Sequence, residues 1–397
     1  MWKILSLIIL SLFIAKNVFA DNEMPEKARP DDKTISLYEY KKKIFIKNRR
    51  DQGRLYTIKP KGNAKIFNYE KNISSSKLES QLSKGYLLSY LFYDKGVIKY
   101  DGKAKDGRFL DNINNKTLFY THSTGKSIVS YIIGHAICDG YIASMDETID
   151  WPLMKNTLYQ GQPLRNLLNM SAGDQEYVHS SDFLLENNFS SGTDDYAQDI
   201  SQYITYFKNS KKGKSEFNYS AFATQLILNY VLFKTGDDFE KILEKTFNKK
   251  ARIKDSVIFW KVKNSSKQKG NANIMFYATR YDYLRIAKAM LDDWQKDTCV
   301  GKYLKTIFEN RIDKENDKKE REGRGDRIQY RFASGYAGQF QTHYKGISKK
   351  RAVMGMHGRS GQHVVIDFER SRIVVTNALY EDFNYKKIVY DPIKKGK

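Results

Sequence analysis

The chain has few of the residues that build metal centres. Only two cysteines, Cys138 and Cys299, and six histidines occur among its 397 residues. Two cysteines cannot form a structural zinc site alone, and no Cys/His cluster joins them. No two histidines have the His-x-x-x-His spacing that places both rings on one face of a helix. We therefore expect no metal-dependent chemistry.

Long apolar runs are also missing, except at the start of the chain. Residues 1–20, MWKILSLIILSLFIAKNVFA, place Lys3 before a short apolar run and end in Val18-Phe19-Ala20, which resembles a cleavage site. This layout is typical of a secretory signal peptide, so we expect a periplasmic or secreted protein. An uncleaved anchor helix is the alternative, although the run is short for a bilayer. No cysteine follows the cleavage site, so a lipid anchor is not indicated.

Acidic residues are outnumbered by basic ones. The formal net charge is +22, and removal of Lys3 and Lys16 with the signal peptide leaves +20. The basic residues are scattered and no nucleic-acid-binding signature accompanies them, so we expect association with anionic envelope surfaces and not with nucleic acid. An oxidising compartment would permit a bridge between Cys138 and Cys299. The sequence leaves that pairing open, because it does not show the distance between their Cα atoms.

Hydrophobic periodicity divides the mature chain into three parts. Residues 21–75 are polar and Lys-rich, and we expect an extended N-terminal arm there. Residues 76–135 and 311–397 are predicted to form one α/β sheet domain, and residues 136–310 a mainly helical subdomain inserted into it. Strands at both ends with helices between them indicate a single sheet built from both ends of the chain.

Local signals support this division. Asp94-Lys95-Gly96 separates two β-rich runs and predicts a hairpin. Apolar residues at helical spacing follow Ser127 and predict a helix that stops near Gly140. Further helices are predicted at 220–236, closed by Gly236, and at 279–295, where Thr279 is a candidate N-cap. The C-terminal part returns to β-rich segments, which are IQYRF, GYAGQFQTHY, RAVMGMH, QHVVIDF and RIVVTN. The final amphipathic stretch FNYKKIVYDPI is predicted as a helix covering the sheet.

The stretch FYTHSTGKSIVSYIIGHAICDG, residues 119–140, admits two chemistries. Its Gly125-Lys126-Ser127 matches the end of a phosphate-binding P-loop, but such a loop needs glycine six residues before the lysine. That position is Tyr120, so the nucleotide interpretation fails. The other interpretation is a Ser-x-x-Lys motif formed by Ser123 and Lys126.

The Ser-x-x-Lys interpretation agrees with the predicted helix. Ser123 lies at the helix start, where unpaired N–H groups and the helix dipole favour negative charge. A serine there can form an acyl-enzyme while its own N–H stabilises the oxyanion. Lys126 lies one turn further on the same face, and partial desolvation would let it accept the serine proton. The alternative is that Ser123 is an ordinary helix cap.

Three further segments follow this motif in a recognisable order. They are LRNLLNMSAGD (164–174), SEFNYSAFATQLI (215–227) and MGMHGRSGQHVVIDFERSRIVV (354–375). Together with residues 119–140 they resemble the serine β-lactamase and penicillin-binding-protein superfamily. The chain is most similar to its class C β-lactamase-related branch of DD-peptidases, esterases and 6-aminohexanoate-dimer hydrolases. The resemblance covers roughly residues 85–390 and implies an α/β plus all-α, β-lactamase/transpeptidase-like fold, with an antiparallel sheet flanked by helices.

The resemblance implies three catalytic side chains. Ser123 corresponds to the nucleophile and Lys126 to its proton acceptor. Tyr219 corresponds to the phenol that passes the proton to the leaving group. His122, next to the nucleophile, is expected to be a packing residue and not a base.

The third motif aligns with Met356-His357-Gly358. Gly358 would keep the edge strand open to substrate, and the backbone N–H of Arg359 would complete the oxyanion hole with that of Ser123. The side chains of His357 and Arg359 are predicted substrate contacts. Met356 and Ala221 stand where the family has polar side chains, and this argues against efficient β-lactam turnover.

These expectations together describe a serine hydrolase. It would cleave an ester or amide of a small-molecule or peptide-like substrate, without a cofactor. A Ser-His-Asp triad is excluded, because the sequence from Gly358 to Gly361 lacks the strand–turn–helix context of a nucleophile elbow. A DD-peptidase or β-lactamase activity, and a non-catalytic envelope ligand-binding protein, are the alternatives.

Overall fold

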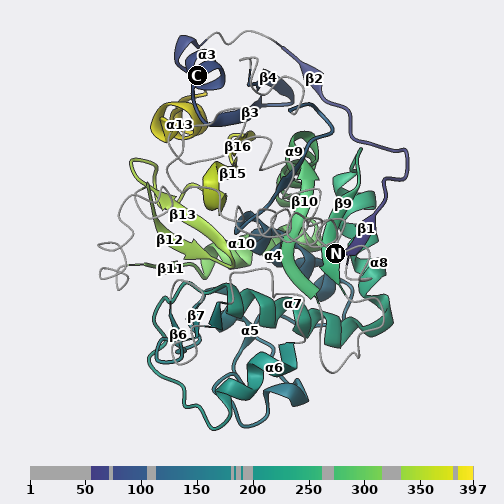
Figure 1. The fold of residues 1–397 in the computed structure, drawn as a ribbon, viewed down its shortest axis with the longest axis vertical. Helices are drawn as coiled ribbons and strands as arrows, with labels where there is room; N and C mark the ends of the chain where they lie inside the picture. The colour runs from purple at the N-terminus through teal and green to yellow at the C-terminus, as the bar shows by residue number, and fades with distance from the viewer. Residues whose placement is uncertain are drawn as a thin grey trace, which may run out of the picture.

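A nine-stranded sheet combines strands from the N-terminal and C-terminal parts of the described chain (Figure 1). In this computed structural model the described residues are 55–70, 75–104, 113–179, 183–184, 189–190, 200–261, 272–314, 332–378 and 383–396. The strand order is β11-β12-β13-β14-β15-β16-β3-β4-β2, and every pair is antiparallel except β2 with β4. The strands are β2 (Asn68–Tyr69), β3 (Leu87–Asp94), β4 (Val97–Lys103), β11 (Ile312–Asp313), β12 (Ala333–Ala337), β13 (Phe340–Tyr344), β14 (Val353–Gly358), β15 (Gln362–Asp367) and β16 (Arg372–Ala378).

The N-terminal and C-terminal strands of this sheet meet where β16 pairs with β3. The two strands pair from Arg372 with Asp94 onward, and β16 is buried along its whole length. The predicted hairpin between β3 and β4 forms, because Lys95 and Gly96 adopt positive φ in the turn. A sheet built from both chain ends is therefore present, as the sequence predicted.

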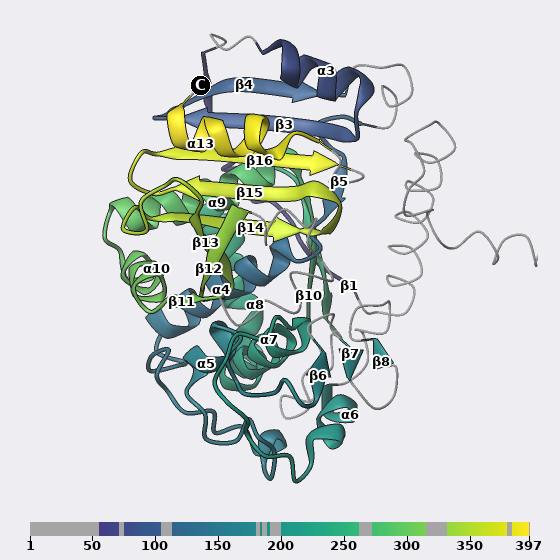
Figure 2. The same ribbon diagram turned by 90° about the vertical axis from the view of Figure 1, so that its left-hand side faces the viewer.

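The four long helices of the described residues are α4 (Thr124–Cys138), α7 (Ala221–Thr235), α9 (Arg280–Gln295) and α10 (Cys299–Glu309). Of these, α4, α9 and α10 contact the sheet, and α7 packs against α4 (Figure 2). The predicted caps are present, because Thr279 accepts a hydrogen bond from Asp282 N at the start of α9 and Gly236 ends α7. Helix α4 contacts α7, α10 and β14, so it lies at the centre of the molecule.

Shorter helical segments complete the described chain. The C-terminal stretch was predicted as a helix covering the sheet, and it contains a π-helical turn at Lys386–Tyr390 followed by α13. Together with α3, these two segments pack against the sheet face formed by Val353, Val365 and Val374. The α-helices are α3 (Ser76–Lys84), α5 (Leu164–Leu168), α6 (Ile200–Ile204), α8 (Phe239–Glu244) and α13 (Asp391–Lys395).

Two features differ from the sequence predictions. Residues 335–344, predicted as one strand, belong to β12 and β13, which are joined by a turn at Gly338 and Gln339. A second sheet has the order β1-β9-β10-β5, with strands β1 (Leu55–Ile58), β5 (Leu118–Tyr120), β9 (Val257–Lys261) and β10 (Ala272–Thr279). It draws strands from the predicted arm and from the region predicted to be mainly helical. A small third sheet contains β6 (Val178–His179), β7 (Phe183–Leu184) and β8 (Phe189–Ser190).

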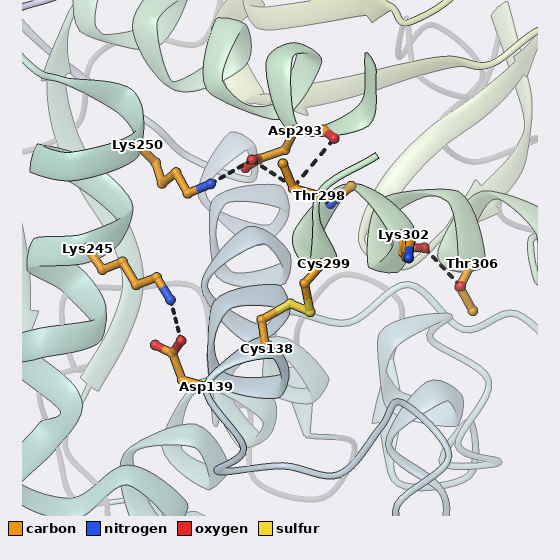
Figure 3. Close-up of a disulfide and its surroundings, with 10 residues drawn as sticks. Cys138, Asp139, Lys245, Lys250, Asp293, Thr298, Cys299, Lys302 and Thr306 are labelled. Carbon is orange, nitrogen blue, oxygen red and sulfur yellow. Dashed lines mark hydrogen bonds and ion pairs between the residues drawn. A yellow bond between two sulfur atoms is a disulfide. The ribbon is translucent and has the colours of Figure 1, made fainter. Parts of the chain in front are cut away.

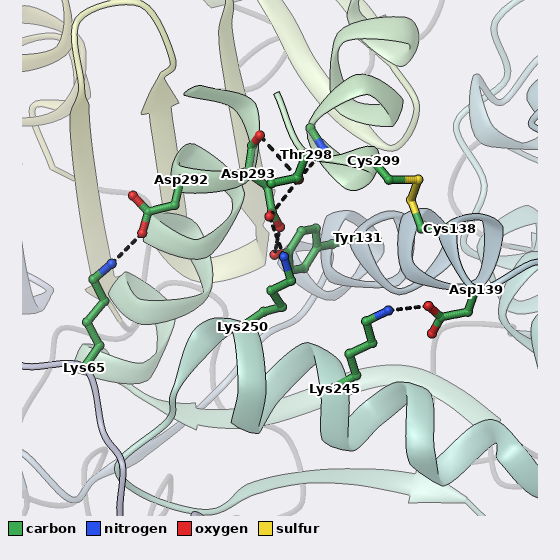
Figure 4. Close-up of polar contacts among 11 residues, drawn as sticks. Lys65, Tyr131, Cys138, Asp139, Lys245, Lys250, Asp292, Asp293, Thr298 and Cys299 are labelled. Atoms are coloured by element: carbon green, nitrogen blue, oxygen red, sulfur yellow. Dashed lines mark hydrogen bonds and ion pairs between the residues drawn. A yellow bond between two sulfur atoms is a disulfide. The ribbon is translucent and has the colours of Figure 1, made fainter. Parts of the chain in front are cut away.

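The cysteine pairing that the sequence left open is formed. Cys138 at the end of α4 is bonded to Cys299 at the start of α10, with their Cα atoms 5.8 Å apart (Figure 3). The two helices also share the buried Asp293 carboxylate, which accepts hydrogen bonds from Tyr131 (2.6 Å), Lys250 (2.8 Å) and Thr298 (2.9 Å) (Figure 4). Among the described residues, no helix combines the length and the apolar character needed to cross a membrane.

Candidate active site

Ser123 precedes the first turn of α4 and does not cap it. Its backbone is already near-helical, at φ −66° and ψ −10°, and its side chain makes no capping hydrogen bond. The Ser123 Oγ instead accepts a hydrogen bond from Lys126 Nζ at 3.2 Å. The structure therefore favours the Ser-x-x-Lys interpretation over the ordinary helix cap.

Lys126 and Tyr219 complete a group of three side chains. Only 1% of the Lys126 surface is exposed, and its Nζ lies 4.9 Å from the centre of the Tyr219 ring. Tyr219 comes from the segment before α7, next to Ser220, whose hydroxyl caps that helix. Ser123 and Tyr219, almost 100 positions apart in the sequence, thus both lie next to the Lys126 amino group. This amino group can exchange protons with the Ser123 hydroxyl and lies against the Tyr219 phenol.

A buried carboxyl group positions the Tyr219 segment. Asp174 accepts hydrogen bonds from Asn218 Nδ2 (2.8 Å) and from the Tyr159 hydroxyl (2.9 Å), while Asn218 N donates to Met170 O (2.7 Å). Burial raises the pKa of Asp174, although the two hydrogen bonds oppose this shift. Asp174 closes the segment LRNLLNMSAGD, but the sequence analysis gave that residue no role.

The turn between β12 and β13 holds the helices around the site together. Ser127 Oγ donates to Gln339 O (2.6 Å), and Thr224 Oγ1 donates to Gln339 Oε1 (2.7 Å). The Gln339 amide group in turn donates to the Leu167 and Leu168 carbonyl oxygens of α5. One glutamine therefore links α4, α5 and α7, and the sequence analysis did not identify it.

Gly358 lets the third predicted motif approach Ser123. A Cβ atom at this position would lie 2.4 Å from the Thr121 carbonyl oxygen and 2.8 Å from Thr124 Oγ1, so only glycine fits. Thr124 Oγ1 also donates to Gln362 O at 3.1 Å. The turn between Gly358 and Gln362 contains Arg359, and it therefore lies against the start of α4. An oxyanion hole formed by the backbone N–H groups of Ser123 and Arg359 requires this placement.

His357 lies in a different place from the one predicted. The residue is 4% exposed, and its ring packs against Tyr385 of the C-terminal segment. Its Nδ1 is 2.7 Å from His363 Nδ1, and its Nε2 is 2.5 Å from the Tyr344 hydroxyl. Because these partners occupy both ring nitrogens, the ring is not available for the predicted substrate contact.

His122 is consistent with the packing role expected from the sequence. Its ring packs edge-to-face against Tyr120, with centroids 4.7 Å apart, and its backbone has a positive φ of 46°. Burial, together with the nearby Arg359 and Lys126 cations, lowers the pKa of His122 to about 3. The ring is therefore neutral at pH 7. No cluster of candidate metal ligands occurs within the described ranges.

Comparison with known proteins identifies the fold. No protein-family model and no curated protein matches the sequence. A solved structure assigned as a 6-aminohexanoate-dimer hydrolase from Bacillus anthracis is 13% identical, with a TM-score of 0.59 over 94% of this chain and 96% of that one. One assigned as a β-lactamase from Bacteroides dorei is 15% identical, with a TM-score of 0.55 over 78% and 90%. A penicillin-binding protein from Bacillus halodurans is 13% identical, with a TM-score of 0.52 over 78% and 97%. The chain therefore has the fold of the serine β-lactamases and penicillin-binding proteins, as its motifs implied.

Proposed function

We propose that the protein is a periplasmic or secreted serine hydrolase that cleaves an ester or amide bond through an acyl-enzyme on Ser123. The observation that carries the proposal is the buried Lys126 amino group, 3.2 Å from Ser123 Oγ and against the Tyr219 ring. Similarity in fold to proteins assigned as hydrolases supports the same class of activity.

In the proposed cycle, Ser123 Oγ attacks the carbonyl carbon while its proton passes to the Lys126 amino group. The resulting oxyanion accepts hydrogen bonds from the backbone N–H groups of Ser123 and Arg359. As the carbon–oxygen or carbon–nitrogen bond breaks, Tyr219 gives a proton to the departing alcohol or amine and recovers one from Lys126. Water then attacks the acyl ester, which releases the acid and restores the Ser123 hydroxyl. No cofactor takes part in these steps.

Two observations support export from the cytoplasm. The first twenty residues have the layout of a signal peptide, although they lie outside the described residues. The Cys138–Cys299 disulfide is a bond that persists in oxidising compartments.

A DD-peptidase or β-lactamase activity is the second candidate, favoured by the names of the similar structures. Ala221 and Met356 argue against it. Both side chains are apolar and have no exposed surface, so neither offers substrate a polar contact. A non-catalytic ligand-binding role would require an unreactive Ser123.

Labelling with a fluorophosphonate tests whether Ser123 is activated. We expect intact mass spectrometry to show one adduct on the wild type and none on Ser123→Ala, with melting temperatures within a few degrees of each other. Ser348→Ala removes an exposed serine and is the matched control, which should label like the wild type. An adduct on Ser123→Ala would overturn the assignment. No adduct on folded wild type would favour the ligand-binding alternative, whereas labelling would justify a screen of esters, amides and β-lactams.

A further inference from the structure

Two histidines face each other on the two strands that flank the turn containing Arg359. His357 on β14 is the cross-strand partner of His363 on β15, and their Nδ1 atoms are 2.7 Å apart. Their exposed fractions are 4% and 0%. They flank the turn closely, since His357 precedes Gly358 and His363 follows Gln362.

The contact between the two rings constrains their protonation. A hydrogen bond between two ring nitrogens needs one N–H donor and one lone pair, so a neutral pair satisfies it. His357 Nε2 is shared with the Tyr344 hydroxyl (2.5 Å) and the Tyr385 hydroxyl (3.4 Å). His363 Nε2 is buried and has no hydrogen-bond partner within the described structure. If both rings were protonated, their Nδ1–H groups would point at each other and the hydrogen bond would be lost.

The surroundings also disfavour an added proton. Burial, His363 and the nearby Lys314 lower the pKa of His357, and burial lowers the pKa of His363 to about 3. The charged and titratable groups facing the pair are Lys314 from the end of β11, Tyr344 from β13 and Tyr385 from the C-terminal segment. None of the described groups that shift these two pKa values is a carboxylate.

The pair is one of several attachments that hold the turn. Thr124 on α4 donates to Gln362 O (3.1 Å), and Thr376 on β16 donates to Gly361 O (2.9 Å). The Gln362 side chain also donates to Ala378 O (2.7 Å) and accepts from Asn377 Nδ2 (2.9 Å). These contacts hold the Gln362 end, and the histidine pair links the two strands on either side of the turn.

We propose that His357 and His363 are positioning residues that hold the turn at 358–362 against Ser123 only while both rings are neutral. The inference rests on the proposed function, because it assigns the Arg359 N–H to the oxyanion hole. In acid, a proton on either ring places a charge in a buried site beside Lys314, so an open arrangement in which that ring reaches solvent becomes more favourable. The turn then moves away from Ser123 and acylation slows.

The sign of the effect follows from the direction of the pKa shifts. Because both folded-state pKa values lie below the unfolded value of about 6.5, the pair's full contribution to stability is present above that pH. It is lost progressively as the pH falls towards the folded-state values.

The test compares the wild type with the double variant His357→Asn/His363→Asn, in which neither side chain ionises. Acylation by the fluorophosphonate and hydrogen exchange of the peptide 353–367 would be measured at about pH 7.5 and about pH 4.5. We expect the acid-induced loss of acylation to be about tenfold larger in the wild type than in the variant. The protection of 353–367, corrected for intrinsic exchange, should fall in acid in the wild type only. His343→Asn on β13 is the matched control, which should retain the wild-type profile.

Each outcome either supports or overturns the proposed role of the histidine pair. Equal pH dependence of exchange in the wild type and the double variant overturns the inference, and so does unchanged protection of 353–367 in acid. If the double variant does not fold, His363→Asn is compared instead and should lose less protection in acid than the wild type. If no variant is acylated at any pH but exchange behaves as expected, the histidine pair is supported and the hydrolase proposal is wrong.

Discussion

At the scale of single residues, Asp174 shows how a side chain outside the motifs controls one inside them. It reaches Tyr219 only through Asn218, so it is a positioning residue. In Asp174→Ala, Asn218 Nδ2 and the Tyr159 hydroxyl lose a buried partner, which should lower the free energy of unfolding by about 1–3 kcal/mol. We expect the rate loss to be larger for an anilide than for a nitrophenyl ester, because only the poorer leaving group needs the proton from Tyr219.

Steady-state kinetics on the two substrates measures this difference. Asp174→Asn keeps an oxygen acceptor for Asn218 and is the matched variant, which should restore most of the anilide rate. Equal losses on both substrates would show that Asp174 serves stability alone.

The sequence was sufficient to predict which residue types the chemistry needs, but it did not always predict the direction in which their side chains point. Ser123 and Lys126 share a helix face because their spacing is one turn, and the structure has them in contact. On β14 the strand alternation decides which side chain meets the helices. Met356 takes that side and His357 takes the other, which the alignment of the motif did not reveal.

At the scale of elements, the sequence predicted a feature correctly where the contact that stabilises it joins residues close together in the chain. The caps at Thr279 and Gly236 act within one turn of their helices, and both were predicted. The β1-β9-β10-β5 sheet was missed because Leu55 pairs with Trp260, and no local pattern records so distant a partner. The turn at Gly338 and Gln339 was missed because Gln339 adopts positive φ, which is uncommon for residues other than glycine.

The disulfide between α4 and α10 makes a prediction at the same scale. Cys138 and Cys299 are 161 positions apart, so the bond restricts a long segment of the unfolded chain. In Cys138→Ser/Cys299→Ser, we expect the free energy of unfolding to fall by about 2–5 kcal/mol. Urea denaturation of the double variant, beside oxidised and reduced wild type, measures the difference.

Activity should respond less than stability, because the whole length of α4 separates Cys138 from Ser123. Labelling of folded double variant at close to the wild-type rate is therefore expected. Unchanged stability would mean that the shared Asp293 network alone secures the two helices.

At the scale of the whole molecule, the excess of positive charge is a property that composition alone establishes. Three of the basic side chains line one cavity in the structure, together with one carboxylate. A cavity of about 610 Å³ lies between the turns of β3–β4 and β15–β16 and is lined by Lys95, Glu369, Arg370, Ser371 and Arg372. Because successive turns of an antiparallel sheet alternate between its ends, this cavity lies at the opposite end of β15 from the turn at 358–362. An anionic polymer could bind there without covering Ser123.

We therefore expect the cavity to contribute to binding of an anionic envelope polymer, with heparin as the probe. Lys95→Glu/Arg370→Glu should elute from a heparin column at lower salt than the wild type, because two exposed cations become anions. Lys302→Glu/Lys305→Glu makes the same charge change on α10 and should shift elution less. Fluorophosphonate labelling should be the same in all three proteins. Equal elution shifts for the two double variants would show that net charge alone governs retention, without a localised site.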